Sequence, residues 1–407
     1  MIIIFRQRQF KICLAVYTAG VTFLIMCAPK ISEYSKTTTL YNKLINTISI
    51  NNKNKDESWK SNNPRNATPQ HMETIFSKTM VTERTMAESG TWIQHLCPRY
   101  KTQDASKFTK LTWRTPSEDT IFFTQMSCRT ALTRREACAV ESAAHHHPHR
   151  PILVLMTAPA LNHTHPFIQV LAGLRNVQLA WLDLDQVFNE EPLQRWHGGR
   201  LWLLEATGHM VTIVGDAARV ELLRRYGGTY LDLDALTLRP LPNTTNWLAR
   251  VTDHLVGNGV LSFTSGHPLL QAVVADIPTA FDPTSHISIG PELLTRHLQR
   301  LCPDNASLPS GSPAKPEACG SVTIWPSQFV YPFHFGFESH ELPSIFREGL
   351  GLGPAFFNST RAFSLHLYNS LSERSFVTLT GDSILKEAFC RNCPQVMQIL
   401  RKHRTFL

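Results

Sequence analysis

The chain has 407 residues, of which 43% are apolar and 18% charged, and 40 basic against 32 acidic residues give a net charge of +8. This composition excludes a wholly disordered or collagen-like chain and leaves enough apolar material for one large domain or two ordinary ones. A basic excess suits an anionic partner, but here it is scattered along the chain, so we expect no nucleic-acid partner.

An apolar segment near the N-terminus predicts a membrane anchor. Residues 12–28 carry no charge and are just long enough to cross the hydrocarbon core of a bilayer as a helix. Basic residues in the preceding tail, residues 1–11, should keep that tail cytosolic and place the rest of the chain in the lumen. A cleaved signal peptide is the alternative, but Cys27-Ala28-Pro29 is a poor cleavage site. We therefore expect a single-pass type II membrane protein.

The next segment has the composition of a flexible lumenal stem. Residues 29–117 are rich in Ser, Thr, Asn and Lys and show no sustained hydrophobic period. Such a segment buries too little apolar surface to offset its chain entropy, and part of the basic excess lies here. Acceptor sequons for glycosylation agree with lumenal exposure and begin at Asn66, Asn162, Asn243, Asn305 and Asn358.

From residue 118 onward, short apolar runs alternate with helical periodicity, which is typical of a single α/β domain over residues 118–407. We expect Asp216 to cap a helix that ends at Gly227-Gly228. The predicted strands are residues 120–124, 151–157, 177–184 and 229–233. The predicted helices are residues 134–144, 216–226, 268–280, 291–301 and 383–401.

Residues near the middle of the chain carry the most informative chemistry. Asp232 and Asp234 are two apart after a predicted strand, so their carboxylates should point to the same side of an extended backbone. Converging carboxylates repel each other unless a hard cation lies between them, and such a cation can bind a diphosphate. Asp216 and Arg219 share a helical face and could reach ribose or base donors and phosphate oxygens. Tyr230 is placed to stack on or hydrogen-bond to the same ligand.

A second Asp-x-Asp, formed by Asp183 and Asp185, also follows an apolar run. No Gly-Gly-x-Tyr sequence precedes it, and the residues after it have helical character. We interpret Asp185 as a helix cap and the pair as unrelated to metal binding.

The segment DAARVELLRRYGGTYLDLD, residues 216–234, resembles the sugar-nucleotide site of DXD-containing lumenal glycosyltransferases. It is most similar to the alpha-1,4-galactosyltransferase (lactosylceramide 4-alpha-galactosyltransferase) family and its alpha-1,4-N-acetylgalactosaminyltransferase relatives. The resemblance covers about residues 118–400. It implies a GT-A type fold, a UDP-sugar donor, Mn²⁺ (or Mg²⁺) and retention of the α configuration. It also implies site roles: Asp232 and Asp234 as the catalytic metal–diphosphate pair, with Asp216, Arg219 and Tyr230 at the donor nucleotide.

The resemblance extends to a second stretch near the C-terminus. His366 and Asn369 stand where the family has a His-x-Trp-Asn element near the diphosphate, and Tyr368 replaces the Trp. A further departure is Ile289 before Gly290-Pro291, where relatives usually carry Asn or Gln. Either side chain could bear on donor choice or activity.

Retention requires either a carboxylate nucleophile or same-face attack within an ion pair, and the residues leave both open. Glu292 is a weak candidate for the nucleophile, and we prefer to interpret it as an acid stabilised at a helix start. The metal would stabilise the charge that develops on the departing diphosphate.

Other conspicuous residues are interpreted as structural. The histidines within residues 145–149 have no acidic or Cys partner in the pattern, which favours an exposed loop over a metal site. In an oxidising lumen the cysteines should form disulfides, and Cys390-x-x-Cys393 lacks the second pair of a zinc site. The preferred pairs are Cys302 with Cys319, then Cys128 with Cys138.

Together these features predict a Golgi type II membrane enzyme that transfers galactose or N-acetylgalactosamine in alpha-1,4 linkage from a UDP-sugar to a glycolipid, specifically a glycosphingolipid. A related hexosyltransferase with another donor or a glycoprotein acceptor is one alternative. A catalytically inactive Golgi binding protein is another, although the intact acidic motif argues against it.

Overall fold

The computed structural model describes residues 2–5, 13–16, 97, 105–196, 209–282, 284–303, 315–336, 341–349, 351–404 and 406–407. It divides into two compact units, Met1–Glu88 and Ser89–Leu407. In the first unit, β1 (Ile2–Phe5) pairs antiparallel with β2 (Cys13–Val16). The expected anchor helix is not seen: residues 13–16 form a strand, and the rest of 12–28 lies outside the described residues. None of the helices described is both long and apolar enough to span a bilayer.

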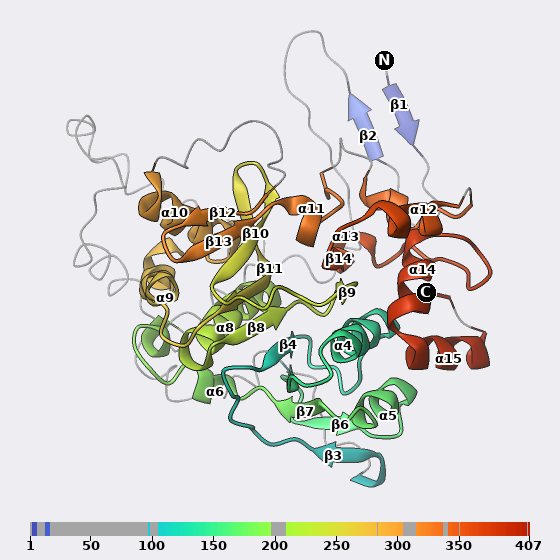
Figure 1. Cartoon of the computed structure of the whole chain (residues 1–407), viewed down its shortest axis with the longest axis horizontal. Helices are drawn as coiled ribbons and strands as arrows, with labels where there is room; N and C mark the ends of the chain where they lie inside the picture. Colours follow the sequence, from blue (N-terminus) through green and yellow to red (C-terminus); the bar gives the residue numbers. More distant parts are fainter. Residues whose placement is uncertain are drawn as a thin grey trace. The chain divides into compact units, whose positions relative to one another are not determined.

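The second unit is built around a mixed eight-stranded sheet (Figure 1). β8, β4, β5 and β7 are parallel neighbours, and β11 continues the sheet antiparallel to β8. The strands are, in spatial order, β12 (Glu317–Cys319), β13 (Val322–Trp325), β10 (Trp247–Thr252), β11 (Leu255–Phe263), β8 (Gly228–Leu231), β4 (Ile121–Gln125), β5 (Ile152–Met156) and β7 (Val177–Trp181).

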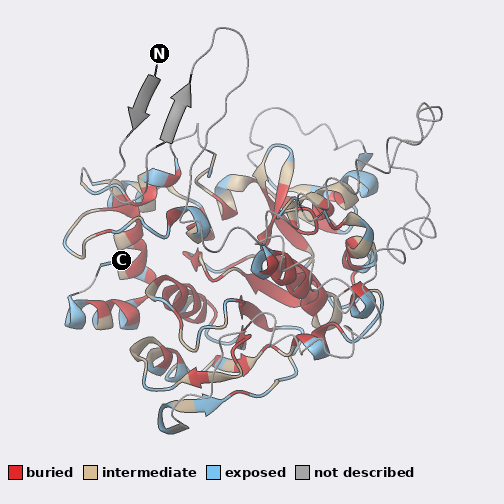
Figure 2. Ribbon diagram, turned by 180° about the vertical axis from the view of Figure 1, so that it is seen from behind, coloured by how far each residue is buried: buried red, intermediate tan, exposed pale blue. Residues whose placement is uncertain are grey.

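Helices cover both faces of this sheet, because neighbouring side chains on a strand point to opposite sides. On β4, Ile121 and Phe123 belong to one buried core and Phe122 to the other. The first core is covered by α4 (Arg134–His146), α5 (Pro166–Ala172), α14 (Ile384–Asn392) and α15 (Pro394–His403). The second is covered by α8 (Met210–Tyr226), α9 (Pro268–Ala280) and α10 (Pro291–Leu301). Figure 2 shows the central strands buried between these layers.

Two smaller sheets and several short helices make up the rest of the described part of this unit. β3 (Phe108–Lys110) pairs with β6 (Ala160–Asn162), so part of the segment expected to be stem lies against the folded domain. β9 (Ala235–Thr237) pairs with β14 (Ser364–His366). The remaining helices are η3 (Ala105–Lys107), α6 (Leu184–Val187), α11 (Ser327–Val330), η5 (Leu342–Ile345), α12 (Leu352–Ser359) and α13 (Asn369–Ser372).

Most predicted elements are present, and α9 and α10 have the predicted bounds. Two helix predictions were wrong in detail. α8 begins at Met210, so Asp216 lies inside the helix and is not its cap. The predicted helix 383–401 is two helices, because Pro394 has no N–H with which to continue α14 and instead occupies the first turn of α15.

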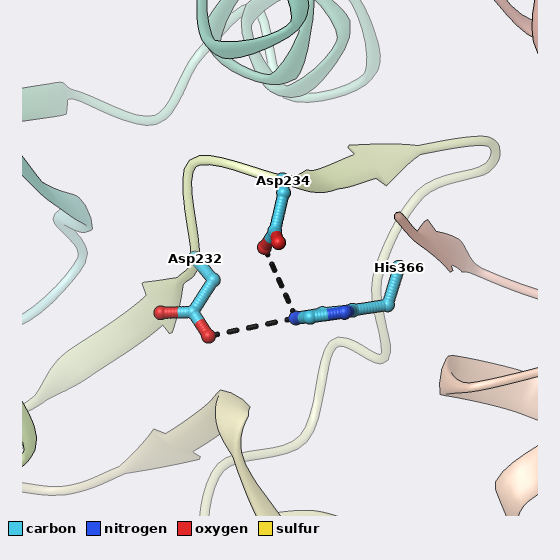
Figure 3. A group of neighbouring side chains, drawn as sticks. All are labelled: Asp232, Asp234 and His366. Atoms are coloured by element: carbon cyan, nitrogen blue, oxygen red, sulfur yellow. Dashed lines mark hydrogen bonds and ion pairs between the residues drawn. The ribbon is translucent and has the colours of Figure 1, made fainter. Parts of the chain in front are cut away.

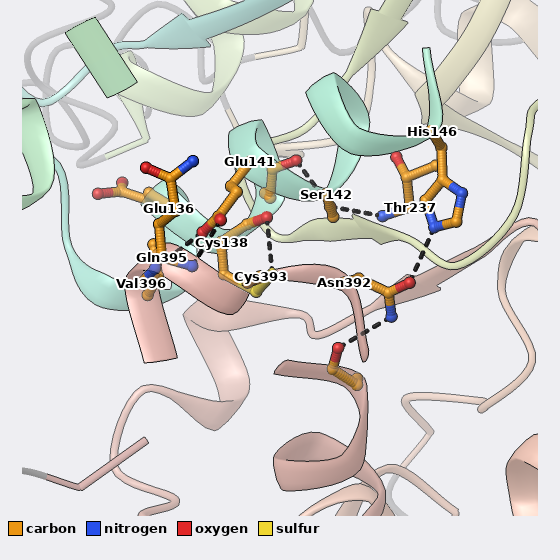
Figure 4. Close-up of a disulfide and its surroundings, with 12 residues drawn as sticks. Glu136, Cys138, Glu141, Ser142, His146, Thr237, Asn392, Cys393, Gln395 and Val396 are labelled. Atoms are coloured by element: carbon orange, nitrogen blue, oxygen red, sulfur yellow. Dashed lines mark hydrogen bonds between the residues drawn. A yellow bond between two sulfur atoms is a disulfide. The ribbon is translucent and has the colours of Figure 1, made fainter. Parts of the chain in front are cut away.

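The structure confirms one expected disulfide and corrects the other. Cys302 pairs with Cys319 as predicted, whereas Cys128 pairs with Cys97, not with Cys138. Cys138 of α4 bonds instead to Cys393, which lies 255 residues away in the sequence at the junction of α14 and α15 (Figure 4). Packing of these helices across the first core brings the two cysteines together, and local spacing does not show it. The thiol of Cys390 is free.

The expected exposed loop was wrong for three of the histidines at residues 145–149, because His145 and His146 form the last turn of α4 and His147 is buried. His146 ends α4 and hydrogen-bonds through Nε2 to Asn392 Oδ1 at 2.8 Å. His147 is buried and accepts a hydrogen bond from the amide of Leu241 at 3.2 Å. Burial lowers the pKa of His147 to about 4. Both rings therefore hold elements together and no metal site forms there among the described residues.

Candidate active site

Asp232 and Asp234 lie at the carboxyl end of β8, in the interior of the sheet. Gly227 and Gly228 have φ values of +66° and +101°, a conformation that favours glycine and lets α8 turn directly into this strand. The amide of Asp232 donates to the carbonyl of Gly259 on β11 at 2.7 Å. β8 itself ends at Leu231, immediately before Asp232. The hydrogen bond to Gly259 therefore holds the start of the acidic motif against the neighbouring strand β11.

His366 joins the two aspartates from a distant part of the chain. In the β9–β14 pair, His366 lies opposite Ala235, the residue after Asp234. Its Nε2 is 3.1 Å from Asp234 Oδ1 and 3.5 Å from Asp232 Oδ2 (Figure 3). Within the described part of the chain, this is the one group of three acidic, His or Cys side chains whose donor atoms all lie within 4.8 Å of one another.

Arg219 and Tyr230 hold Asp232 from the other side. Arg219 Nη1 is 3.0 Å from Asp232 Oδ1, and its Nη2 is 3.3 Å from Asp216 Oδ1. The Tyr230 hydroxyl donates to Asp232 Oδ1 at 2.9 Å, and the guanidinium lies 4.7 Å from the Tyr230 ring centroid. The tertiary structure therefore brings these four predicted residues into one network with Asp234 and His366.

The charges in this network perturb one another. Burial opposes ionisation of Asp232, but Arg219 and His366 outweigh it and lower its pKa. Burial opposes the imidazolium form of His366, but Asp234 and Asp232 outweigh it and raise its pKa. Burial raises the pKa of Asp216 to about 6, although Arg219 opposes this shift. Shifts of this kind concentrate at functional sites.

The donor set fits a divalent cation. Asp232 and Asp234 offer carboxylate oxygens, which hard cations such as Mg²⁺ and Mn²⁺ prefer. His366 Nδ1 accepts a hydrogen bond from the amide of Tyr368 at 3.2 Å, so in the neutral ring Nε2 carries the proton and faces the carboxylates. In this state His366 donates to the acids, and it would ligate a cation only from the other tautomer.

The remaining predicted residues lie at the edge of this network. The amide of Asn369 donates to Asp234 Oδ2 at 2.7 Å. Tyr368 has a left-handed φ of 47°, and its ring centroid is 4.4 Å from that of His366. Asp216 is buried and lies against Gly290 at the start of α10. Ile289 is fully buried in the second core, so it fills the hydrophobic core and does not line the acidic cluster.

The sequence did not identify two residues beside the cluster. The hydroxyl of Tyr331 accepts from the amide of Val260 at 3.0 Å, and its ring centroid is 5.4 Å from that of His366. Tyr331 lies in FVYPF, residues 329–333, and no local pattern in these residues indicates the contact with His366. Arg135 of α4 donates to Asn369 Oδ1 at 3.2 Å. Nothing in the helical pattern around Arg135 indicates this contact.

The second Asp-x-Asp has a structural role. Asp183 Oδ1 accepts hydrogen bonds from the amides of Asp185 and Gln186 at 3.1 and 3.4 Å, which caps α6. The pair is therefore structural, as predicted, but the cap is Asp183 and not Asp185. Asp183 comes first because the side chain of an N-cap residue accepts from amides two or three positions later.

Two family models match the chain. "Glycosyltransferase sugar-binding region containing DXD motif" matches residues 133–252, and "Alpha 1,4-glycosyltransferase conserved region" matches residues 262–400. The first match contains Asp232 and Asp234, and the second contains His366 and Asn369.

Named relatives agree with these models. Lactosylceramide 4-alpha-galactosyltransferases from Gorilla gorilla gorilla and Homo sapiens are each 29% identical over 292 residues, which is 71% of this chain and 85% and 79% of those proteins. The Homo sapiens Alpha-1,4-N-acetylglucosaminyltransferase is 27% identical over 289 residues, covering 69% of this chain and 81% of that protein. The solved structure of the PaToxG Glycosyltransferase matches 47% of this chain and 72% of its own, with 14% identity and a TM-score of 0.36.

Proposed function

We propose that this chain, which belongs to the DXD-containing alpha-1,4-glycosyltransferase family, transfers galactose or N-acetylgalactosamine in alpha-1,4 linkage to a glycolipid. The chain is a hexosyltransferase that uses a UDP-sugar. The observation that carries the proposal is the convergence of Asp232, Asp234 and His366 at the carboxyl end of β8. Ligands bind at this end of the strands in open α/β sheets.

The residues of the cluster have distinct roles in this proposal. Asp232 and Asp234 would hold Mn²⁺ or Mg²⁺, and such a cation supplies Lewis-acid stabilisation of the leaving diphosphate when bound. Arg219 and Tyr230 restrict the rotation of Asp232 through the 3.0 and 2.9 Å contacts to its Oδ1. Fixed carboxylates lose less freedom when the donor binds, which favours catalysis by positioning.

We assign a GT-A type fold and retention of the α configuration on the same resemblance. The mixed α/β sheet with helices on both faces supports the fold assignment. Glu292 lies in the first turn of α10, which supports the interpretation that it stabilises a helix start. Same-face attack within an ion pair is therefore the mechanism we favour.

A second donor deserves a direct comparison with galactose. The similarity to a human Alpha-1,4-N-acetylglucosaminyltransferase extends over 69% of this chain, so N-acetylglucosamine is an alternative donor sugar. This relative and the galactosyltransferases differ by only a few per cent in identity to the chain, so similarity alone does not separate the donors.

We further propose that the protein resides in the Golgi membrane with its catalytic domain in the lumen. The apolar residues 12–28 and the basic tail before them support this orientation. The three disulfides of the second unit support an oxidising compartment, where such bonds persist.

The test uses the full chain purified in detergent with Mn²⁺ and a panel of UDP-galactose, UDP-N-acetylgalactosamine and UDP-N-acetylglucosamine. Lactosylceramide serves as glycolipid acceptor and a glycoprotein as the competing acceptor. We expect transfer from one donor to the glycolipid and an α-1,4 linkage by NMR of the product. A β anomer would contradict retention, and the absence of both transfer and Mn²⁺-dependent UDP binding would contradict the enzyme.

A further inference from the structure

We propose that Arg135 is a positioning residue of the active site: it holds residues 369–375 so that the backbone amide of Asn369 fixes the carboxylate of Asp234. Among the described contacts, Arg135 makes no hydrogen bond to Asp232 or Asp234. It acts on Asp234 through Asn369. The inference rests on the proposed function, because it concerns the cation for which Asp234 is a candidate ligand.

The contacts of Arg135 extend over the whole of this segment. The side chain is buried, with 5% of the residue exposed. Its Nη1 donates to Asn369 Oδ1 at 3.2 Å and to Ser372, both to its carbonyl at 3.0 Å and to its Oγ at 3.1 Å. Its Nη2 donates to the carbonyl of Ser375. The planar guanidinium thereby holds the start, middle and end of one short segment in fixed relation.

This segment and Leu367 just before it restrain Asp234 at two points. The amide of Asn369 donates to Asp234 Oδ2 at 2.7 Å, and the amide of Leu367 donates to the carbonyl of Asp234 at 2.8 Å. The Ser372 hydroxyl, which Arg135 contacts, donates to the carbonyl of Leu367 at 2.6 Å. One oxygen of Asp234 is therefore fixed by Asn369, while the other lies 3.1 Å from His366.

The helix that carries Arg135 is itself firmly held. At its start, Thr133 and Glu136 form a reciprocal capping box. One turn later, Cys138 is bonded to Cys393, and Glu141 accepts hydrogen bonds from the amides of α15 (Figure 4). Arg135 lies between these anchors, so its guanidinium is presented from a rigid base.

The charge of Arg135 points to the same function. Each acceptor of its hydrogen bonds is a neutral carbonyl, amide or hydroxyl. Burial lowers its pKa to about 10, Arg134 adds to this effect, and Asp234 opposes it. A buried cation without a directly paired acid is costly, so this arrangement needs a compensating benefit. The attraction between the guanidinium and the Asp234 carboxylate, together with the stacking of the guanidinium over the Phe346 ring at 4.9 Å, offsets part of this cost.

The test compares Mn²⁺ binding by the wild-type chain and three variants, measured in the presence of UDP by electron paramagnetic resonance of the free ion. Arg135→Gln should weaken Mn²⁺ binding about 10- to 100-fold, as for other residues that orient a metal ligand. Arg135→Lys should give an intermediate loss, because an ammonium keeps the charge but does not reproduce the fork. Arg134→Gln is the matched control, because the Arg134 guanidinium lies 5.5 Å from the centroid of the Phe376 ring. This variant should bind Mn²⁺ with the affinity of the wild type.

Kinetics and folding supply the second readout. Arg135→Gln should lower kcat for transfer and leave the KM of the acceptor unchanged. Wild-type Mn²⁺ affinity in a folded Arg135→Gln protein would overturn the proposal, and if that variant does not fold, wild-type affinity in Arg135→Lys would overturn it. A wild-type chain that neither binds Mn²⁺ nor transfers sugar would instead contradict the proposed function, so the two failures are distinguishable.

Discussion

Asp183-x-Asp185 and Asp232-x-Asp234 have the same spacing, and each follows a strand of the central sheet, yet they have different surroundings. After β7, Asp183 turns back to cap the four-residue helix α6. After β8, Asp232 and Asp234 contact side chains from α8 and β14. The motif is the same in both places, and the neighbours determine what it can bind.

The position of each strand in the sheet explains the difference. β7 is an edge strand, whereas β8 lies between β4 and β11. The antiparallel neighbour β11 contributes Gly259, whose carbonyl accepts from the amide of Asp232. The end of an interior strand has neighbours from several elements, whereas the end of an edge strand has few. An Asp-x-Asp motif therefore predicts a metal site only when the position of the preceding strand within the sheet is known.

The largest expected effect separates the two motifs directly. Asp234→Asn should reduce kcat/KM for sugar transfer by at least about 100-fold, because a neutral amide binds a divalent cation and its diphosphate poorly. Asp185→Asn, the matched change in the other motif, should leave transfer nearly unchanged. Thermal unfolding should show both variants folded. Equal turnover in wild type and Asp234→Asn would show that Asp234 does not hold the cation that transfer needs.

A smaller effect is expected from crowding the site without changing its chemistry. A Cβ on Gly259 would lie 2.5 Å from Asp232 Oδ2 and 3.1 Å from His366 Nε2. Gly259→Ala should therefore displace the carboxylate and weaken Mn²⁺ binding about 10-fold, with the fold retained. Gly173→Ala, on the exposed end of α5, is the matched control. Undiminished Mn²⁺ affinity in Gly259→Ala would argue that Asp232 Oδ2 is not a ligand.

Cation binding at Asp232 and Asp234 should depend on pH, because His366 lies beside these two aspartates. His366 has a raised pKa, so its imidazolium form persists above the usual value near 6.5 and repels a cation beside Asp234. Mn²⁺ affinity should increase by up to about 10-fold per pH unit as pH rises through this pKa. The stability of the metal-free protein should depend on pH in the opposite direction. The contribution of His366 to the free energy of unfolding is complete below the usual His pKa and disappears as pH rises through the raised pKa of the folded protein. His366→Gln should remove both dependences, and a residual slope would implicate another group.

The smallest effect belongs to the capping motif. Asp183→Ala should lower the free energy of unfolding by about 1 kcal/mol, because two amides at the start of α6 lose their acceptor. Sugar transfer should not change at temperatures where the variant is folded. Urea denaturation measures the first quantity and the donor assay the second. A loss of transfer without a loss of stability would give this motif a role in the site.

Much of the fold follows from short-range signals in the sequence. α9 and α10 each begin with a proline in the first turn, where its missing N–H is not needed, and both have the predicted bounds. Gly227 ends α8 where predicted because glycine tolerates the positive φ at that position. The start of α8 was wrong because Asp216, an apparent cap by residue type, is buried beside Gly290. Local preference there is overridden by tertiary packing.

The sequence by itself determined the residue types of the site, since carboxylates two apart at a strand end and an acid and arginine three apart on a helix follow from backbone geometry. Only the tertiary structure decided how His366 contacts the two aspartates, because the β9–β14 pairing places its ring beside them. Likewise, Asn369 is 135 residues from Asp234 in the sequence, and Arg135 is 234 residues from Asn369. Contacts at such separations depend on how whole strands and helices pack, and no local pattern records them.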